Sequence, residues 1–372
     1  MKIGIDVRHL AGGPKTGVGV VTDQLVLALF HALPKSSFAV FYNGWNAPPQ
    51  ELAEWEGREN VSVIRSRIPN RFFDVAAMSG LLRSHARELN TSDVHISPHM
   101  LPLPQLSIPR ILVLHDLSFV RYPDLFSPRR RAWHARIRPY AQAQAATRIV
   151  VPSYATKRDV VELWKIPDEK IHVIPWGTPP VNTKAPGPGP KASSRTILFL
   201  GTMEKRKNVK GLIEAFAQLQ ASGRSDMRLV LAGDLGWGSG EVLELIKKLQ
   251  DPGAVEIFGY VNEDTKRRLF LEADMFVYPS LYEGSALPPL EAMAAGVPTI
   301  VARNTALPEI CGDAVLLVDP MRSDEIALAI TQVADDHQLA DDLAARGRVR
   351  AQTFTWEKTA ASFCEVINEV LA

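Results

Sequence analysis

The stretch PSLYEGSALPPLEAMAAGVPTIV, residues 279–301, contains the end of one strand, a polar loop, a short helix and a second strand. β-Branched and aromatic residues at 275–278 predict a strand that ends as this stretch begins, and residues 299–302 predict the next one. A double proline near the start of the helix at 290–295 and a glycine after its end are typical helix boundaries. Strands that alternate with helices in this way predict a parallel α/β sheet.

Two carboxylates stand on either side of the loop in this stretch. Glu283 follows the carboxyl end of the predicted strand, where ligands bind in open α/β sheets. Glu291 is predicted in the first turn of the helix, and the backbone N–H groups of Gly284, Ser285 and Ala286 between the acids can face a phosphate. The two acids are thus placed to accept hydrogen bonds from both ends of a sugar nucleotide. The alternative for each acid alone is ordinary: a helix-dipole contact or a solvated loop.

Composition limits the class of protein. The chain has 372 residues, enough for two domains, and it is 46% hydrophobic and 22% charged, as in soluble globular proteins. A net charge of +1 does not indicate a nucleic-acid partner. Two cysteines form neither a disulfide framework nor a metal-ligand spacing. The N-terminal sequence MKIGIDVRHLAGG has no signal-peptide core, so we expect a cytoplasmic protein.

The α/β alternation occurs twice, on either side of a Pro- and Gly-rich segment. Residues 182–195, NTKAPGPGPKASSR, have the composition of a semi-rigid linker. We therefore expect one Rossmann-like domain over residues 1–185 and a second over residues 186–355.

The first helix of the chain, predicted over residues 17–32, opens on Gly17, Val18 and Gly19. Backbone N–H groups at such a start point outward and can approach an anion. The segment is not a P-loop, because Val18 occupies the lysine position, and Thr22 replaces the third glycine of a dinucleotide fingerprint. A structural turn is the alternative interpretation.

A polar pair, His115 and Asp116, follows the continuous apolar strand predicted at 111–114. This is the carboxyl tip of a buried parallel strand, where a functional side chain is well placed. A histidine satisfied within its own loop is the alternative.

Residues 127–146 are predicted as one helix that carries five arginines. Such a basic helix is either a solvated face or a surface attracted to anionic lipid or to a lipid diphosphate.

The first loop of the second half reads LGTMEKRKNVKGL, residues 200–212. It places Arg206 and Lys207 beside the start of a helix, where cations and backbone donors together favour an anion. An exposed basic loop is the alternative.

Together these segments resemble a known family. The string E-G-x-x-L-P-x-L-E-A-M-A-x-G-x-P, residues 283–298, is similar to the E-x7-E signature of the retaining glycosyltransferases of family 4, which include bacterial mannosyltransferases and sucrose synthases. The loop G-T-x-E-x-R-K-N at 201–208 and the segment VLHDLSFVRYPDLFSP at 113–128 also resemble that family. The resemblance implies the GT-B architecture: two facing Rossmann-like domains with a deep cleft, in which a C-terminal helix, residues 356–372, crosses back to the first domain.

The resemblance also implies roles for individual residues. Arg206 and Lys207 grip the donor diphosphate, Glu283 holds the sugar hydroxyls, Glu291 holds the ribose, and His115 lies beside the donor sugar and the reacting phosphate oxygen. Further donor-binding positions are Gly17, Gly19, Gly201, Thr202, Val261, Gly284, Ser285, Ala286 and Leu287. No Asp-x-Asp pair is present, so no metal ion or other cofactor is expected.

The expected reaction moves mannose from GDP-mannose to a glycan or a lipid-diphosphate-linked oligosaccharide, with retention at the anomeric carbon. A UDP-sugar donor is the alternative. An epimerase of the same architecture does not require the E-x7-E string, whereas a noncatalytic nucleotide-sugar-binding module is compatible with a departure seen here: Ser285 and Ala286 replace the Phe and Gly of the common E-G-F-G-L-P. The basic helix adds an expected peripheral contact with the anionic inner face of a membrane.

Overall fold

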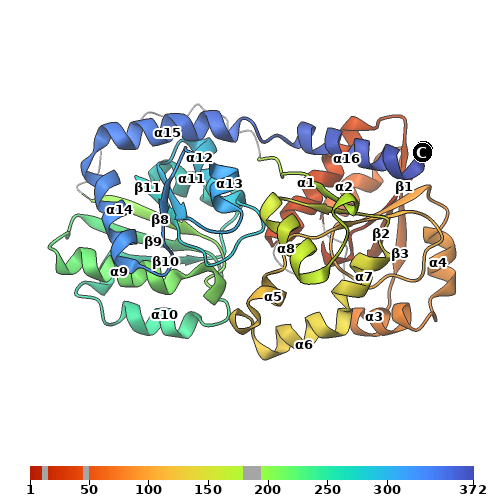
Figure 1. Ribbon diagram of the computed structural model, residues 1–372, viewed down its shortest axis with the longest axis horizontal. Coiled ribbons are helices and arrows are strands. Elements are labelled where there is room, and N and C mark those ends of the chain that lie inside the picture. Colours follow the sequence, from red (N-terminus) through yellow and green to blue (C-terminus); the bar gives the residue numbers. More distant parts are fainter. Residues whose placement is uncertain (11–15, 45–49, 179–193) are drawn as a thin grey trace. The chain divides into compact units, whose positions relative to one another are not determined.

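The computed structural model describes residues 1–10, 16–44, 50–178 and 194–372. It divides into two compact units: residues 1–117, 128–177 and 356–372 form the first, and residues 118–127 and 178–355 form the second. The predicted linker and the boundary expected after residue 185 fall almost entirely outside the described residues. Figure 1 shows both units as α/β sandwiches.

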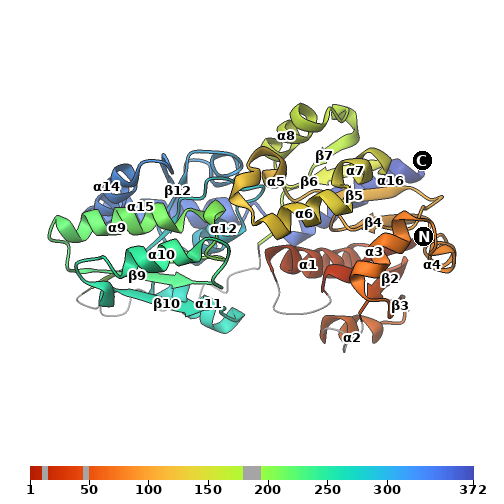
Figure 2. The ribbon, with the colours of Figure 1, turned by 90° about the horizontal axis from the view of Figure 1, so that it is seen from below.

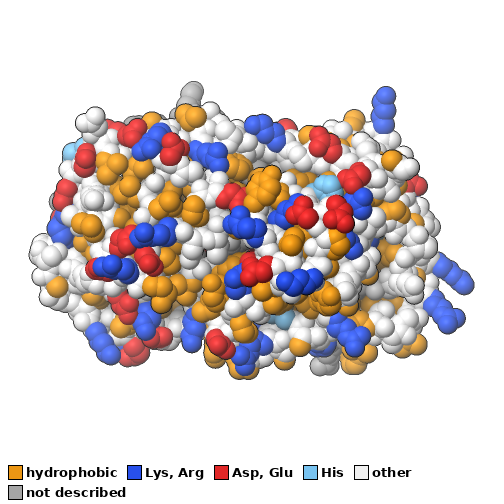
Figure 3. Space-filling view, viewed as in Figure 1, with side chains coloured by type: hydrophobic (Ala, Val, Ile, Leu, Met, Phe, Trp, Pro, Cys, Tyr) orange, Lys and Arg blue, Asp and Glu red, His pale blue; other side chains and the backbone are white. Residues whose placement is uncertain are grey.

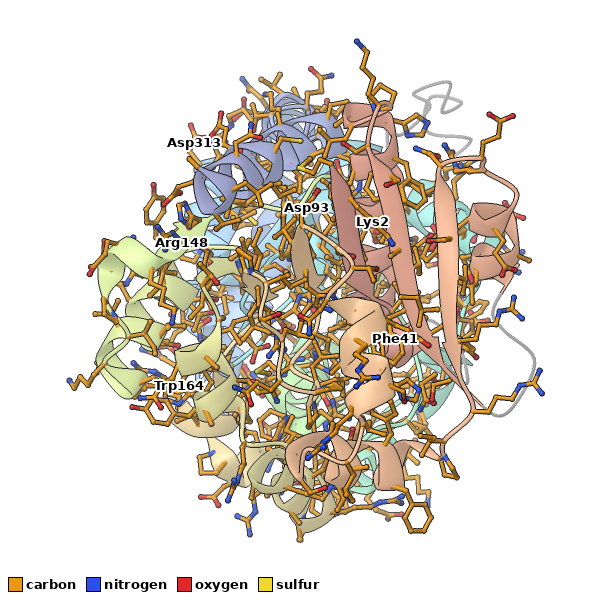
Figure 4. All side chains as sticks on the ribbon, turned by 90° about the vertical axis from the view of Figure 1, so that its right-hand side faces the viewer. Lys2, Phe41, Asp93, Arg148, Trp164 and Asp313 are labelled. Atoms are coloured by element: carbon orange, nitrogen blue, oxygen red, sulfur yellow. The ribbon has the colours of Figure 1, made fainter. Side chains whose placement is uncertain are left out.

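The first unit is built on a parallel sheet of seven strands in the order β3-β2-β1-β4-β5-β6-β7. Its strands are β1 (Lys2–Asp6), β2 (Ser37–Asn43), β3 (Val61–Ser66), β4 (Val94–Ser97), β5 (Arg110–Val113), β6 (Arg148–Val151) and β7 (Ile171–Val173). The order of strands reverses between β1 and β4. There the Lys2 backbone N–H donates to the Asp93 carboxylate at 2.7 Å, and both residues are labelled in Figure 4.

Helices cover both faces of this sheet (Figure 2). They are α1 (Gly17–Ala32), α2 (Gln50–Glu56), α3 (Asn70–Met78), α4 (Arg83–Leu89), α6 (Pro128–Ile137), α7 (Pro139–Ala145), α8 (Tyr154–Trp164) and α16 (Trp356–Leu371), with short 3-10 turns at Arg8–Leu10 and Asp168–Lys170. The C-terminal helix α16 packs against α1, and its Phe363 stacks on Trp176 with ring centroids 6.3 Å apart.

The prediction of a single helix over residues 127–146 is wrong, because the structure has two helices there, α6 and α7. Arg138 between them adopts a left-handed conformation with φ 48°, and Pro139 begins α7. A proline lacks the N–H that an uninterrupted helix needs and disfavours a helical residue before it, so the chain breaks here.

The second unit has a parallel sheet of six strands in the order β10-β9-β8-β11-β12-β13. Its strands are β8 (Arg195–Leu200), β9 (Met227–Ala232), β10 (Val255–Gly259), β11 (Met275–Tyr278), β12 (Thr299–Ala302) and β13 (Leu316–Val318). Its helices are α5 (Ser118–Arg121), α9 (Val209–Ala221), α10 (Ser239–Ile246), α11 (Glu263–Glu272), α12 (Leu287–Ala295), α13 (Leu307–Cys311), α14 (Ser323–Asp335) and α15 (His337–Ala351), with 3-10 turns at Pro123–Leu125, Lys205–Lys207 and Pro252–Ala254. Strand order reverses between β8 and β11.

Glycines allow the loops after β8 and β9 to approach each other. Gly201 and Gly233 adopt φ of 147° and 142°, which favour glycine. A Cβ on Gly233 would lie 2.1 Å from the Gly201 carbonyl oxygen. The loop after β8 is therefore held closely at the carboxyl edge of the sheet.

Side chains of both charges are interspersed over the face shown in Figure 3, as the near-zero net charge predicts. Among the helices of the described ranges, none is long and apolar enough to cross a bilayer.

Candidate functional site

In the second unit, two loops that are far apart in sequence meet where the strand order reverses. One follows β8 and carries residues 205–207; the other follows β11 and carries residues 279–286. Strands β8 and β11 are hydrogen-bonded neighbours, so their carboxyl ends bring the loops together. The Leu281 N–H donates to the Arg206 carbonyl oxygen at 2.8 Å.

Glu283 and Lys207 form a buried ion pair between these loops. The Lys207 Nζ lies 2.6 Å from Glu283 Oε1, and it also donates to the hydroxyl of Tyr278, the last residue of β11. Burial lowers the pKa of Lys207 and Arg206 lowers it further, while Glu283 acts in the opposite direction. Burial, followed by the Glu283 charge, raises the pKa of Tyr278 well above its ordinary value, so this hydroxyl stays protonated at neutral pH.

Arg206 is the second cation on Glu283. Its Nη1 lies 3.0 Å from the Tyr282 carbonyl oxygen and 3.4 Å from Glu283 Oε2. Its other edge binds Glu204 Oε1 through Nε at 3.2 Å and Nη2 at 2.9 Å. The structure thus brings together Arg206, Lys207 and Glu283, three residues that the sequence predicted for one site, and satisfies their charges within the protein.

The backbone of Glu283 is fixed from the far side of its loop. Its N–H donates to Thr305 Oγ1 at 3.0 Å, and its carbonyl accepts from the Ala306 N–H at 3.3 Å. Thr305 has φ 54°, an uncommon conformation for a β-branched residue. Sequence reasoning missed Thr305 and Tyr278; the only signal was that Tyr278 ends a predicted strand just before the loop.

The sequence predicted Glu291 in the first helical turn, and this prediction is wrong. Helix α12 begins at Leu287 with prolines in its first turn, so Glu291 lies in the second turn. Its Oε1 lies 2.8 Å from the Nζ of Lys266 on α11, which also contacts Glu263 at 2.9 Å. Burial raises the pKa of Glu291 despite this cation. Lys266 resembled an ordinary surface charge in the sequence, and only the packing of α11 beside α12 reveals its role.

The remaining donor-binding candidates of this unit lie at strand or helix ends. Ala286 has φ −122°, which any L residue adopts, so the replacement of glycine there causes no backbone strain. Three further candidates follow strands: Gly201 and Thr202 after β8, and Val261 after β10. Gly284 and Ala286 are buried, and Ser285 and Leu287 are partly exposed.

In the first unit, His115 follows β5 and its Nε2 lies 2.8 Å from the Pro98 carbonyl oxygen. A carbonyl only accepts, so Nε2 carries the proton of the neutral ring. Burial lowers the pKa of His115, and the bond to Pro98 opposes this only in part. This histidine is therefore a positioned neutral group and a weak base.

Two further histidines lie beside it. His99 follows β4, and its ring centroid is 6.2 Å from that of His115 and 5.5 Å from that of His9. His9 Nε2 lies 2.7 Å from Thr22 Oγ1 on α1, and burial lowers the pKa of His9 to about 4. Sequence reasoning assigned no role to His9 or His99; their positions directly after two adjacent strands were the available signal.

The start of α1 differs in part from expectation. Gly17 is exposed, and no atom lies within 4 Å of a Cβ built on it. Gly19, in contrast, is buried, and its N–H donates to the Thr16 side chain at 3.4 Å. One of the backbone donors predicted to point outward therefore serves the helix cap.

No group of three or more His, Cys, Asp or Glu side chains within the described ranges is arranged to hold a metal ion.

Comparison with known proteins shows the family. The sequence profile described as "Glycosyl transferases group 1" matches residues 182–350, and that described as "Glycosyltransferase Family 4" matches residues 17–181. The chain is 30% identical over 264 residues to the O-antigen chain mannosyltransferase B of Escherichia coli, covering 66% of this chain and 67% of that protein. The chain belongs to the GT-B glycosyltransferases.

This glycosyltransferase is also 28% identical over 249 residues to the MMP alpha-(1->4)-mannosyltransferase of Mycolicibacterium hassiacum, covering 65% of this chain and 59% of that one. Two solved structures share its fold. Sucrose-phosphate synthase from Thermosynechococcus elongatus has a TM-score of 0.79 at 20% identity, with 99% of this chain and 98% of that chain covered. HepE of Anabaena, solved with UDP-glucose, has a TM-score of 0.75 at 16% identity, with 99% and 100% covered. The predicted fold class, two Rossmann-like α/β domains of the GT-B type, is confirmed.

Proposed function

We propose that this glycosyltransferase moves mannose from GDP-mannose to a glycan or a lipid-diphosphate-linked oligosaccharide, with retention at the anomeric carbon. The observation that carries the proposal is the meeting of Arg206, Lys207 and Glu283 at the carboxyl edge of the second sheet. Two relatives named as mannosyltransferases support the choice of sugar, and the Escherichia coli relative is named for the O-antigen chain.

The departure of a nucleoside diphosphate is the demanding step, because negative charge grows on the leaving oxygen. Arg206 and Lys207 neutralise that charge in the proposed reaction, and no metal ion is required. Both cations bind carboxylates in the structure. The donor diphosphate therefore exchanges partners with Glu283 and Glu204, and Glu283 is released to accept hydrogen bonds from the sugar hydroxyls.

No covalent nucleophile is assigned. In the proposed retaining mechanism the leaving phosphate oxygen takes the proton of the acceptor hydroxyl, which attacks the same face of the sugar. Glu283 supports the oxocarbenium-like state, and His115 positions the sugar and phosphate. The lowered pKa of His115 agrees with a positioning role, because a weak base does not compete for that proton.

Further residues are proposed to contact the donor. Glu291 holds the ribose, and Val261 meets the base. The proposed backbone contacts to the diphosphate are at Gly201, Thr202, Gly284, Ser285, Ala286 and Leu287. In the first unit Gly17 remains a candidate, whereas the Gly19 N–H serves the helix cap. Lys266 fixes one oxygen of Glu291 at 2.8 Å, and a carboxylate has further lone pairs that can accept from ribose hydroxyls.

A lipid-linked acceptor places this enzyme in the cytoplasm at the inner face of a membrane. The exposed arginines of α6 support this location, since anionic headgroups attract them.

Thermal unfolding with GDP, GDP-mannose, UDP and UDP-glucose, with and without Mg²⁺ and EDTA, tests the donor. A ligand that binds the folded state raises the Tm by mass action. We expect GDP and GDP-mannose to raise it equally with and without metal. A shift by UDP species alone overturns the choice of GDP-mannose, and a shift that requires Mg²⁺ overturns the metal-independent site.

A UDP-sugar donor is the second candidate, favoured by the structural similarity to a protein solved with UDP-glucose. The variant Glu283→Gln distinguishes a noncatalytic binding module from an enzyme that uses either donor. For an enzyme, we expect this variant to retain nucleotide binding and lose transfer to an acceptor. If the wild type binds the nucleotide sugar and transfers to no acceptor, the chain is a binding module.

A further inference from the structure

Helix α3 of the first unit is apolar on two opposite faces. Its inner face contributes Phe73 and Ala77 to a buried cluster with Phe41, Leu82 and Leu89. A helix that is apolar on both faces is normally covered on both.

The outer face of α3 is nevertheless exposed. Phe72 is 57% exposed, Val75 is 53% exposed and Met78 is 40% exposed. They follow one another at intervals of three residues, so they form a single stripe along the helix. Leu81, just beyond the helix, is 76% exposed and extends this stripe. We name these four side chains the α3 stripe. Contiguous exposed apolar residues of this size usually mark a contact with a partner or a membrane.

Exposed arginines lie on the two helices that neighbour α3. Arg83 and Arg87 are exposed on α4, which follows the stripe directly in the chain. Helix α6 lies beside α3 in both Figures 1 and 2. Arg136 of α6 lies 3.7 Å from Asp74 of α3, and Arg129 is exposed on the same helix. The acid on α3 itself, Asp74, is buried, so the exposed side of α3 presents no carboxylate within its described residues.

We propose that the α3 stripe and the exposed arginines of α4 and α6 dock this protein onto an anionic lipid bilayer, with the four apolar side chains in the headgroup–acyl boundary. The chain as a whole has a net charge of only +1, so the arginines here are a local feature. Apolar insertion together with arginine–headgroup attraction is the pattern of a monotopic surface. A protein interface of this polarity would require an acidic, apolar partner, and a second copy of the chain would bring its own arginines against these.

This inference deepens the membrane-side location proposed above. Its test measures no transfer of sugar, so failure of one proposal is distinguishable from failure of the other.

The experiment is flotation of the full chain with vesicles of phosphatidylcholine alone and of phosphatidylcholine with phosphatidylglycerol. We expect binding only to the anionic vesicles, and weaker binding as ionic strength rises. The triple variant Phe72→Ser, Val75→Ser and Leu81→Ser is expected to lower the partition coefficient about 100-fold. Replacing Arg83, Arg87 and Arg129 by Gln is expected to lower it about tenfold or more, since each basic residue near an anionic surface contributes to binding.

The second unit supplies a matched control for surface polarity. Leu328, Val349 and Met321 are 58%, 67% and 78% exposed, and the triple replacement of these by Ser is expected to leave vesicle binding unchanged. The proposal is overturned if the wild type binds neither vesicle, or if the control variant loses as much binding as the α3 variant. It is also overturned if light scattering shows a dimer that the α3 variant dissociates while vesicle binding is unaffected, because the stripe then serves a second copy.

Discussion

The two units share one architecture and differ in the chemistry at their strand ends. In the first, the residues that follow β1, β4 and β5 include His9, His99 and His115, whose pKa values burial lowers. In the second, the loops after β8 and β11 carry Lys207 and Glu283 as a buried ion pair. A neutral donor and acceptor set suits hydroxyl groups, whereas cations suit a diphosphate. The sheet topology therefore determines where a site forms, and the charge state of a few side chains determines what it binds.

The charged site of the second unit is tested most severely by Lys207→Met. Methionine has similar length and no charge, so Glu283 keeps only Arg206, and an incoming diphosphate loses one cation. We expect the affinity for GDP, measured by calorimetric titration, to fall about 100-fold or more.

Lys210→Met is the matched control. Lys210 lies three residues further along the chain, is exposed and contacts Glu241 and Glu214, so its removal is expected to leave GDP affinity unchanged. Unaltered GDP affinity in a folded Lys207→Met protein would contradict the assignment of the diphosphate to this loop.

The neutral histidines of the first unit predict acid sensitivity. Burial lowers the pKa of His95 from 6.5 to about 3 and that of His9 to about 4. The folded state keeps these rings neutral while the unfolded chain protonates them below pH 6.5. The unfolded state thus binds more protons, and the free energy of unfolding falls as pH falls from 6.5 toward 3. The slope is about 1.4 kcal/mol per pH unit for each such group.

His95→Leu isolates one of these groups. Neither ring nitrogen of His95 has a hydrogen-bond partner in the structure, so an apolar side chain of similar volume is expected to be tolerated. Urea unfolding between pH 7.5 and 4, which starts above the ordinary histidine pKa of 6.5 and ends above the lowered pKa of His95, should show a pH slope reduced by about one proton below pH 6.5. A slope equal to that of the wild type would show that His95 does not cause the acid sensitivity.

Lys266→Met tests whether the ion pair on α12 differs in role from the one on the β11 loop. Removing this cation raises the pKa of the buried Glu291 further, so Glu291 is protonated at a higher pH and accepts hydrogen bonds from a ribose less well. We expect GDP affinity to fall about tenfold near neutral pH, as for the loss of one charge-assisted hydrogen bond, and to fall with acidification at a higher pH than in the wild type. Glu263 contacts the same lysine, so the variant Glu263→Gln is the control, and it is expected to change the affinity for GDP little. If Lys266→Met and the wild type bound GDP with equal affinity at every pH, Glu291 would have no part in nucleotide binding.

The smallest predicted effect belongs to Tyr278→Phe. Its hydroxyl accepts from Lys207, which keeps Glu283 as a partner. We expect a loss of about 1 kcal/mol in the free energy of unfolding and nearly unchanged GDP affinity. Tyr140→Phe removes an exposed hydroxyl that contacts Gln144 at 2.6 Å and should cost less. A large loss of affinity in Tyr278→Phe would make this tyrosine a binding residue.

The pattern of elements was readable from the sequence because it depends on local chemistry. β-Branched, aromatic and apolar runs predicted the strands β11 at 275–278 and β12 at 299–302 with the observed bounds. The helix predicted over residues 17–32 is α1 with the same bounds, and the Thr16 side chain accepts from the Gly19 N–H at its start. Local predictions failed where prolines were misjudged: Pro139 divides the basic helix, and prolines inside the first turn of α12 allow it to start at Leu287.

The sequence by itself determined two parallel α/β sheets, the loops that carry the candidate residues and the resemblance to glycosyltransferases. Those features depend on alternating apolar segments and on residues close together in the chain. Only the tertiary structure decided that Lys207 pairs with Glu283, which lies 76 positions away, that Lys266 pairs with Glu291, and that His9, His99 and His115 gather at one sheet edge. The strength of an ion pair and the charge of a histidine depend on burial and on partners distant in sequence, and the folded packing of the strands supplies both.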